Sequence, residues 1–290
     1  MTAVANPLTA ARGGILARSR LRITPDLVTL WIALAWLVVV LIAAVVPQAF
    51  STADPTALDP AGAMRAPGVA GHPFGTDHFG RDIATLLAYG ARTAMVIGIS
   101  ATVVGFVIGT LLGLVAGYAG GWVDMIVGRF IDMLMCFPGV LLAMIIAAGL
   151  GASMQNLIVA VGISAVPGFA RIMRGQAMTV RSRLFIEAAD SVGFGPWRIL
   201  WRHLLPNALA PSIVMATVTV GVSIVAAASL SFLGLGARAD VPDWGELLAL
   251  GQPYLASAWW ITTFPGIVLT LTVIAVSLAG DWLRDRFNVD

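Results

Sequence analysis

Lysine is absent from this 290-residue chain, and all 17 of its basic residues are arginine. A P-loop holds nucleotide phosphates through the lysine that follows its second conserved glycine. The chain therefore contains no P-loop and is not itself an ATPase of that class. Its arginines are not interleaved with aromatic residues in a basic patch, so the sequence does not indicate a nucleic-acid-binding protein either.

Charge of either sign is scarce, and the chain has a single cysteine. Charged residues make up 11% of the chain and hydrophobic residues 59%, with a mean hydropathy of +0.91. A soluble domain has about a quarter of its residues charged. Cys136 has no second cysteine to pair with, which excludes an internal disulfide. The composition excludes an ordinary soluble enzyme and indicates a protein embedded in a membrane.

Long apolar runs are what the sequence has in abundance. A helix needs about 20 apolar residues to cross the hydrocarbon core, and six runs approach or exceed this length: 27–46, 95–117, 131–149, 157–170, 213–235 and 260–280. The fourth run is short and ends near Pro167. The first run follows four arginines, but it is longer than the roughly 7–15 residues of a signal-peptide core, so we expect it to be retained. The sequence predicts an all-α membrane protein with six transmembrane helices.

The arginines divide unequally between the two sides that six spans create. With the N-terminus inside, thirteen arginines fall on the inner side, including Arg12, Arg18, Arg20 and Arg22, and four fall outside, including Arg238. Arginine-rich segments stay in the cytoplasm, so both termini are predicted to be cytoplasmic in a multi-pass protein of the plasma (inner) membrane. The expected organisation is a cytoplasmic tail (1–26), a first transmembrane helix (27–47), an extracytoplasmic loop (48–93), a five-helix core (94–282) with an inner loop at 171–211, and a cytoplasmic tail (283–290).

The two outer segments differ in character. Residues 48–74 are rich in proline, glycine, alanine and aspartate, which is typical of an irregular loop. The second segment carries Trp244, Tyr254, Trp259 and Trp260. Because aromatic rings with a polar atom favour the membrane surface, we interpret this group as an aromatic belt.

The inner loop 171–211 is much longer than the few residues that usually join packed spans. Gly193 is predicted to end a first amphipathic helix, Pro196 to open a second, and Pro206 to end it. The first helix has an apolar side formed by Met178, Leu184, Phe185, Ala188 and Ala189, and the second has a stripe formed by Ile199, Leu200, Leu204 and Leu205. From periodicity alone, this basic helix pair is equally compatible with a position on lipid headgroups.

The residue order within this loop separates the two interpretations. It resembles the EAA loop of bacterial ABC importer permeases, with six matches in one register: Glu187, Ala188, Ala189, Gly193, Leu205 and Pro206. The resemblance implies a type I ABC importer permease fold in which these residues couple the spans to ATPase subunits. Small alanines permit close approach, the carboxylate of Glu187 can accept hydrogen bonds, and glycine permits a sharp turn. His203 departs from the general aliphatic pattern but is familiar in the peptide-transporter branch.

Three further stretches resemble the second (C-type) permease subunit of the dipeptide, oligopeptide and nickel importer family. They are Gly75-Thr76-Asp77-His78-Phe79-Gly80-Arg81-Asp82, Leu230–Gly236 with Pro242-Asp243-Trp244-Gly245, and Gly280-Asp281-Trp282-Leu283-Arg284-Asp285. The resemblance covers roughly residues 72–290. It implies a non-enzymatic permease without cofactors that imports oligopeptides or dipeptides with a homologous second permease, two ABC ATPase domains and an extracytoplasmic peptide-binding protein.

Three alternatives remain beside this hypothesis. A secondary carrier would place ionisable residues within its spans, and the candidates, Asp132 and Asp281, lie at predicted span ends. A membrane enzyme would need converging polar groups, but the predicted topology separates His203 from His72 and His78. A nickel path would need soft or imidazole ligands. Met133, Met135, Cys136 and Met144 fit that description, although ordinary apolar packing explains them more simply.

A candidate translocation path combines small and hydroxyl-bearing residues of two predicted spans: Pro138, Gly139, Thr217, Thr219, Gly221 and Ser223. A passing peptide needs room and hydrogen-bond partners, and proline within a span is tolerated inside a bundle or beside water. The alternative interpretation is helix packing, because small residues also allow close helix approach. No residue is predicted to bind a metal.

Overall fold

The computed structural model describes residues 25–69, 71–237 and 240–287, and within these ranges the secondary structure is helical. The N-terminal arginines at 12, 18, 20 and 22, Arg238 and the end of the predicted C-terminal tail lie outside the described residues. Five helices are long and apolar enough to cross a membrane, and a bent pair of helices would make a sixth span. The five are α1 (Pro25–Val45), α2 (Ile83–Ala119), α5 (Met154–Arg181), α9 (Ala210–Leu230) and α11 (Trp260–Phe287).

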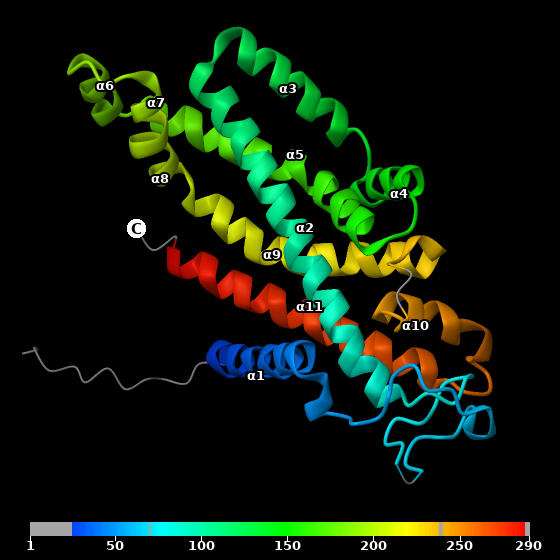
Figure 1. Ribbon diagram of the computed structural model, residues 1–290. Helices are drawn as coiled ribbons and strands as arrows, with labels where there is room; N and C mark the ends of the chain where they lie inside the picture. The colour runs from blue at the N-terminus through cyan, green and yellow to red at the C-terminus, as the bar shows by residue number, and fades with distance from the viewer. Residues whose placement is uncertain (1–24, 70, 238–239, 288–290) are drawn as a thin grey trace, which may run out of the picture.

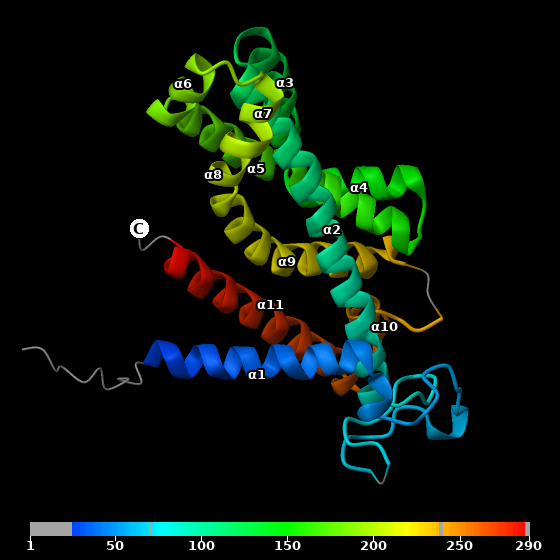
Figure 2. The same cartoon turned by 60° about the vertical axis from the view of Figure 1, so that its left-hand side comes forward.

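The long helices form an elongated bundle with two distinct ends (Figure 1). At one end lie three short helices, α6 (Leu184–Ser191), α7 (Pro196–Arg198) and α8 (Leu205–Ala208), with a π-helical segment η4 (Ile199–Leu204) between α7 and α8. We call this the α6 end. The opposite end carries α10 (Trp244–Gly251) and an irregular segment, the cap, formed by the described residues of 46–82. The first residues of α1 and the last of α11 both point away from the cap (Figure 2).

Four glycines bring α2 and α5 into close contact along their length. Gly105, Gly109, Gly113 and Gly117 follow one another at intervals of four residues, so they form a stripe on one face of α2. An added Cβ at Gly109 would lie 2.6 Å from the Cβ of Phe169, and one at Gly117 would lie 2.7 Å from the Cβ of Ala177. Small residues in such a stripe let membrane helices pack backbone to backbone.

Two of these long helices extend beyond their predicted limits. Asp82 caps α2 by accepting from the Thr85 N–H at 2.8 Å, so the helix begins at Ile83 and the predicted outer loop 48–93 is too long. Helix α5 passes through Pro167 and continues to Arg181. The prediction that proline ends this span is wrong, because the packing of α5 against the glycine stripe outweighs one lost backbone hydrogen bond.

The third predicted span, 131–149, is broken rather than continuous. Helices α3 (Gly121–Met135) and α4 (Gly139–Leu150) meet at an angle of 90°. Pro138 is the N-cap of α4, and a proline disfavours helical conformation in the residue before it. The break therefore falls at the proline, and the predicted number of six spans is reached only if this bent pair counts as one span.

Candidate functional site

Helix α6 ends in the glycine turn that the sequence predicts. Gly193 has a φ of +87°, a left-handed conformation that glycine adopts without a Cβ penalty. Its N–H bonds to the Asp190 carbonyl at 2.8 Å, and the Phe194 N–H bonds to the Ala189 carbonyl at 3.1 Å. Pro196 then opens α7 in its first turn, as predicted. The two bonds and the glycine fix the direction in which the chain leaves α6.

The short helices at the α6 end form one packed unit with the long ones. Ile186 and Ala189 of α6 are buried together with Ile199 and Leu204 of η4. They share an apolar cluster with Leu114 of α2 and with Met173, Ala177 and Val180 of α5. Only Ser182 and Arg183 separate α5 from α6. Helix α6 is therefore packed directly against α2 and α5.

The outward face of α6 differs from the predicted apolar side. Met178 belongs to α5, and Leu184 and Phe185 are exposed, with Leu184 at 81%. Within the EAA-like sequence Glu187 and Ala188 are exposed, whereas Ala189 is buried. The prediction is wrong on these apolar residues because the buried side of α6 follows Ile186 and Ala189. An exposed leucine, carboxylate and small alanine thus stand on one protruding helix.

The sequence predicts that Pro206 ends the second helix of the loop, but this prediction is wrong. Pro206 lies in the first turn of α8. Leu205 is partly buried and Pro206 is exposed. A proline early in a helix sacrifices no intrahelical hydrogen bond, so the chain continues through η4 and α8 into α9. His203 stacks on Phe194 with ring centroids 5.7 Å apart.

A hollow lies between α6 and the junction of α2 with α3. Arg181 of α5 borders it, together with the carboxylates of Glu187 and Asp190. The remaining lining residues are Tyr118, Ala119, Ile186 and Ile199. Exposed charges of both signs beside an open hollow are suited to receiving polar side chains of another protein.

The predicted translocation residues separate into buried and exposed groups. Ser223 is buried, with its hydroxyl 3.2 Å from that of Thr102 on α2. Gly221 packs toward Val276 of α11, and Thr219 bonds to the Met215 carbonyl within its own helix. Thr217 is partly buried, whereas Pro138 and Gly139 are exposed. The surroundings of Thr219, Gly221 and Ser223 match the alternative interpretation, helix packing.

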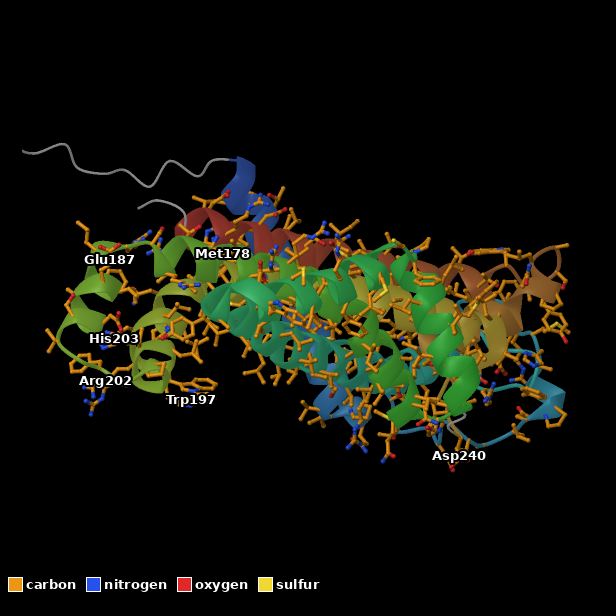
Figure 3. All side chains as sticks on the ribbon, turned by 90° about the horizontal axis from the view of Figure 1, so that it is seen from above. Met178, Glu187, Trp197, Arg202, His203 and Asp240 are labelled. Atoms are coloured by element: carbon orange, nitrogen blue, oxygen red, sulfur yellow. The ribbon has the colours of Figure 1, made fainter. Side chains whose placement is uncertain are left out.

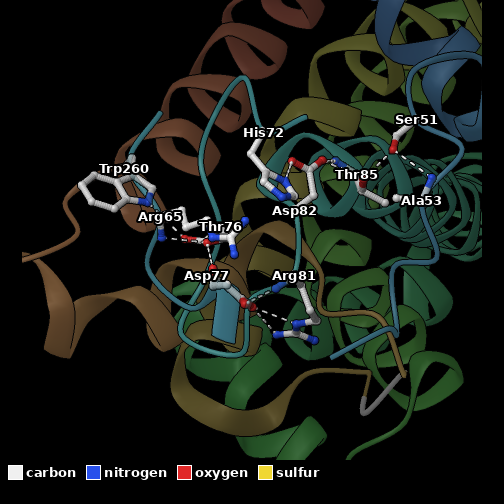
Figure 4. A network of polar contacts seen from close by, with 11 residues as sticks. Ser51, Ala53, Arg65, His72, Thr76, Asp77, Arg81, Asp82, Thr85 and Trp260 are labelled. Atoms are coloured by element: carbon white, nitrogen blue, oxygen red, sulfur yellow. Dashed lines mark hydrogen bonds and ion pairs between the residues drawn. The ribbon is translucent and has the colours of Figure 1, made fainter. Parts of the chain in front are cut away.

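The cap is held together by the stretch 75–82 (Figure 4). Asp77 accepts hydrogen bonds from the Arg81 N–H at 2.9 Å and the Arg81 Nε at 2.8 Å, and Asp77 is fully buried. Thr76 donates to the Gly62 carbonyl at 2.6 Å, and His72 lies 3.1 Å from Asp82. Burial lowers the pKa of the neighbouring His78. The family-like stretch 75–82 thus anchors the cap to the start of α2.

Two tryptophans predicted to lie in an aromatic belt are buried instead. Trp244 donates to the Leu87 carbonyl at 3.0 Å, and Trp260 donates to the Thr76 carbonyl at 3.1 Å. A buried indole N–H requires such a partner, so these residues tie α10 and α11 to α2 and the cap. Trp259 is half exposed and can occupy a membrane surface. The belt interpretation is wrong for Trp244 and Trp260.

Asp243, within the family-like stretch Pro242-Asp243-Trp244-Gly245, is buried and has a role that the sequence did not predict. It caps α10 by accepting from the N–H groups of Gly245 and Glu246, and Ser231 donates to it at 2.6 Å. Burial raises the pKa of the Asp243 carboxyl, against the lowering effect of these three hydrogen bonds. Because aspartate is a favoured N-cap residue, Asp243 could have been predicted to cap a helix that begins at Trp244.

The residues considered for a carrier or a nickel path lie mostly at the surface. Asp132 pairs with Arg171 at 2.8 Å, and Asp281 pairs with Arg284 at 3.2 Å. A second α3 carboxylate, Asp124, pairs with Arg174 of α5. Met133, Met135 and Cys136 are exposed, so the packing interpretation holds only for Met144, which is partly buried. Over the described ranges, no group of three or more histidine, cysteine or acidic side chains could hold a metal ion.

Comparison with known proteins relates the chain to membrane transport components. The family model described as "Binding-protein-dependent transport system inner membrane component" matches residues 109–289. The dipeptide transport system permease protein DppC of Alkalihalophilus pseudofirmus is 40% identical over 230 residues, which is 79% of this chain and 75% of that protein. The glutathione transport system permease protein GsiD of Pectobacterium atrosepticum is 43% identical over 217 residues, 75% of this chain and 72% of that protein.

Among solved structures, the MetNI methionine ABC transporter in an inward facing conformation matches with a TM-score of 0.57 at 22% identity. The match covers 69% of this chain and 95% of the other. At this identity the likeness shows a shared fold, and it confirms the predicted helical permease architecture.

Proposed function

The chain belongs to the family of binding-protein-dependent transport system inner membrane components, and from that premise we propose that it is the permease subunit of an ABC importer for dipeptides or oligopeptides. Relatives named for dipeptide and glutathione transport support this substrate class. The observation that carries the proposal is the protruding helix α6, whose exposed residues match the EAA-like sequence and whose buried residues join it to α2 and α5.

In this proposal α6 is the coupling helix. Its exposed Leu184, Glu187 and Ala188 contact one of two ABC ATPase domains, which bind and hydrolyse ATP. Because Ile186 and Ala189 lock α6 onto the ends of α5 and α2, a movement of the ATPase turns these helices as a rigid body. A homologous second permease completes the pathway between the subunits, and an extracytoplasmic peptide-binding protein delivers the substrate.

The turn after α6 offers a specific test of coupling. Gly193 has open space around it but a positive φ, so a substitution there acts through the backbone. Asparagine tolerates this conformation, whereas isoleucine does not. In the assembled transporter, Gly193→Ile should reduce peptide import per ATP hydrolysed while Gly193→Asn stays close to the wild type. Equal import and equal ATPase binding by the isoleucine variant would contradict the assignment.

The proposed orientation places the α6 end in the cytoplasm and the cap outside. The arginine distribution supports it, and the first residues of α1 and the last of α11 lie on the side away from the cap (Figure 2). A reporter that is active only outside the membrane should be active when fused after Ala57 and silent when fused after Gly195. The reverse pattern would remove the ATPase-contacting role of α6.

The substrate and the energy source can be tested together in proteoliposomes that contain the partner permease, ATPases and binding protein. We expect ATP-dependent uptake of a labelled dipeptide or tripeptide. Uptake of Ni²⁺ without peptide uptake would favour the nickel importer, and ATP-independent peptide uptake would favour a secondary carrier.

A further inference from the structure

The helical segment after the glycine turn presents an exposed aromatic and basic face. Trp197 is 71% exposed and Trp201 is 47% exposed, although Ile199, Leu200 and Leu204 of the same segment are buried. The two tryptophans are four residues apart, as are Arg198 and Arg202, so each pair lies about one helical turn apart on the same side. Both arginines are exposed. We call the surface formed by these four residues the Trp–Arg face.

This face and α6 carry opposite charge, although they are neighbours in the chain. Helix α6 exposes Glu187 and Asp190. After Asp190 the sequence contains no further acidic residue until Asp240. Among the described residues, Arg198 and Arg202 form no ion pair, and Arg198 only lies over the Phe194 ring at 5.2 Å. The Trp–Arg face is therefore purely cationic and has charge left to meet an anionic partner.

The two surfaces also point in different directions. Seen along the view of Figure 3, Glu187 and Trp197 lie on opposite sides of the α6 end, and Trp197 lies nearer to the long helices than Glu187 and Arg202 do. A partner protein that covers α6 from beyond the end of the bundle would leave Trp197 uncovered on the flank of the α6 end.

We propose that the Trp–Arg face rests on anionic phospholipid headgroups of the leaflet at the α6 end. Indole rings combine an apolar body with a polar N–H and favour this depth. Arginines beside them are attracted to lipid phosphates, at about a fivefold preference each for an anionic over a neutral surface. The carboxylates of α6 would be repelled by the same surface, so one loop divides its two helices between a protein partner and lipid. This inference does not depend on the transported substrate.

Spin labels at two positions can test this proposal in the full-length chain, reconstituted without the ATPase subunits. One label replaces Trp197 and the matched control replaces Leu184 on α6, each in a Cys136→Ser background and in nanodiscs that contain phosphatidylglycerol. Collision with dissolved oxygen reports a lipid environment, and collision with a water-soluble nickel complex reports an aqueous one. We expect the ratio of oxygen to nickel collisions to be higher at 197 than at 184 before the ATPase is added.

A second experiment tests the contribution of the two arginines to lipid binding. In Arg198→Gln/Arg202→Gln, the depth of a label at position 201 in phosphatidylglycerol should fall to the value found in neutral phosphatidylcholine. The proposal is overturned if the label at 197 is as accessible to the nickel complex as the one at 184. It is equally overturned if both reagents are excluded from 197, because a protein then covers the face, or if the lipid charge has no effect on the depth at 201.

Discussion

Alanine at Gly113 is expected to push helices α2 and α5 apart. The added methyl carbon would lie 2.3 Å from the Ala170 carbonyl oxygen and 2.8 Å from the Arg174 backbone nitrogen. A carbon and a carbonyl oxygen normally approach to about 3.3–3.6 Å, so α2 and α5 must separate locally by roughly 1 Å. Both obstructing atoms belong to the backbone and cannot rotate away.

The size of the effect follows from two opposing contributions. Extra methylenes in a packed interior cost about 1–3 kcal/mol, whereas replacing glycine by alanine within a helix gains up to about 1 kcal/mol. We therefore expect Gly113→Ala to destabilise the fold by about 1–2 kcal/mol. Gly175→Ala is the matched control, because Gly175 is an exposed helical residue of α5 with no atom within 4 Å of its added Cβ.

The assay is the apparent melting temperature of the purified subunit in detergent, followed by loss of the monodisperse peak. Gly113→Ala should melt below the wild type and Gly175→Ala at or slightly above it, because only the first variant pays the contact penalty. The reasoning is refuted if both variants shift in the same direction by the same amount, or if Gly113→Ala is as stable as the wild type.

Three further predictions concern the cap end and the candidate path. Because burial raises the pKa of Asp243 above its unfolded value, the stability that its protonated form contributes should be lost as the pH rises through the folded pKa. The melting temperature of the wild type relative to Asp243→Asn should then fall as the pH rises above 3.8, the ordinary pKa of an aspartate, and a constant difference would contradict this. Gly75→Ala should expose the cap to proteolysis far more than Gly71→Ala does. Both glycines have a positive φ, but only at Gly75 would the Cβ meet a backbone oxygen, that of Arg65 at 2.5 Å, so equal proteolysis would argue against the close contact. A cysteine at buried Ser223 should resist an aqueous maleimide in every nucleotide state. Labelling at 223 would restore the path assignment.

Hydropathy and turn chemistry predicted the elements that depend on local sequence. The apolar runs located every long helix, and the backbone freedom of Gly193 and the fixed φ of Pro196 located the turn between α6 and α7. These features depend on a single residue or on a continuous apolar run. They can therefore be predicted without knowing which other parts of the chain pack against them.

Features that depend on distant contacts were predicted less well. Helix α5 continues through Pro167 because α2 packs against it, and Trp244 and Trp260 are buried because their partners, Leu87 and Thr76, lie far away in sequence. The spacing of α6 placed Ala189 on the buried side but did not reveal that Ile186 faces inward, since the exposed Leu184 and Phe185 are more hydrophobic than a solvent-facing side usually is. In the sequence, apolar residues that contact a protein or lipid partner give the same hydrophobic pattern as residues buried in the core.

A photoreactive amino acid at position 184 tests most directly whether α6 is the surface that meets the ATPase. Leu184 is 81% exposed on α6, and an aromatic photoreactive side chain replaces it without disturbing the buried side of the helix. In intact cells the account predicts a covalent adduct between this position and an ATP-hydrolysing subunit, and no such adduct from the same side chain at position 57 in the cap. An adduct with the extracytoplasmic binding protein at 184, or capture of the ATPase from position 57, would contradict the account.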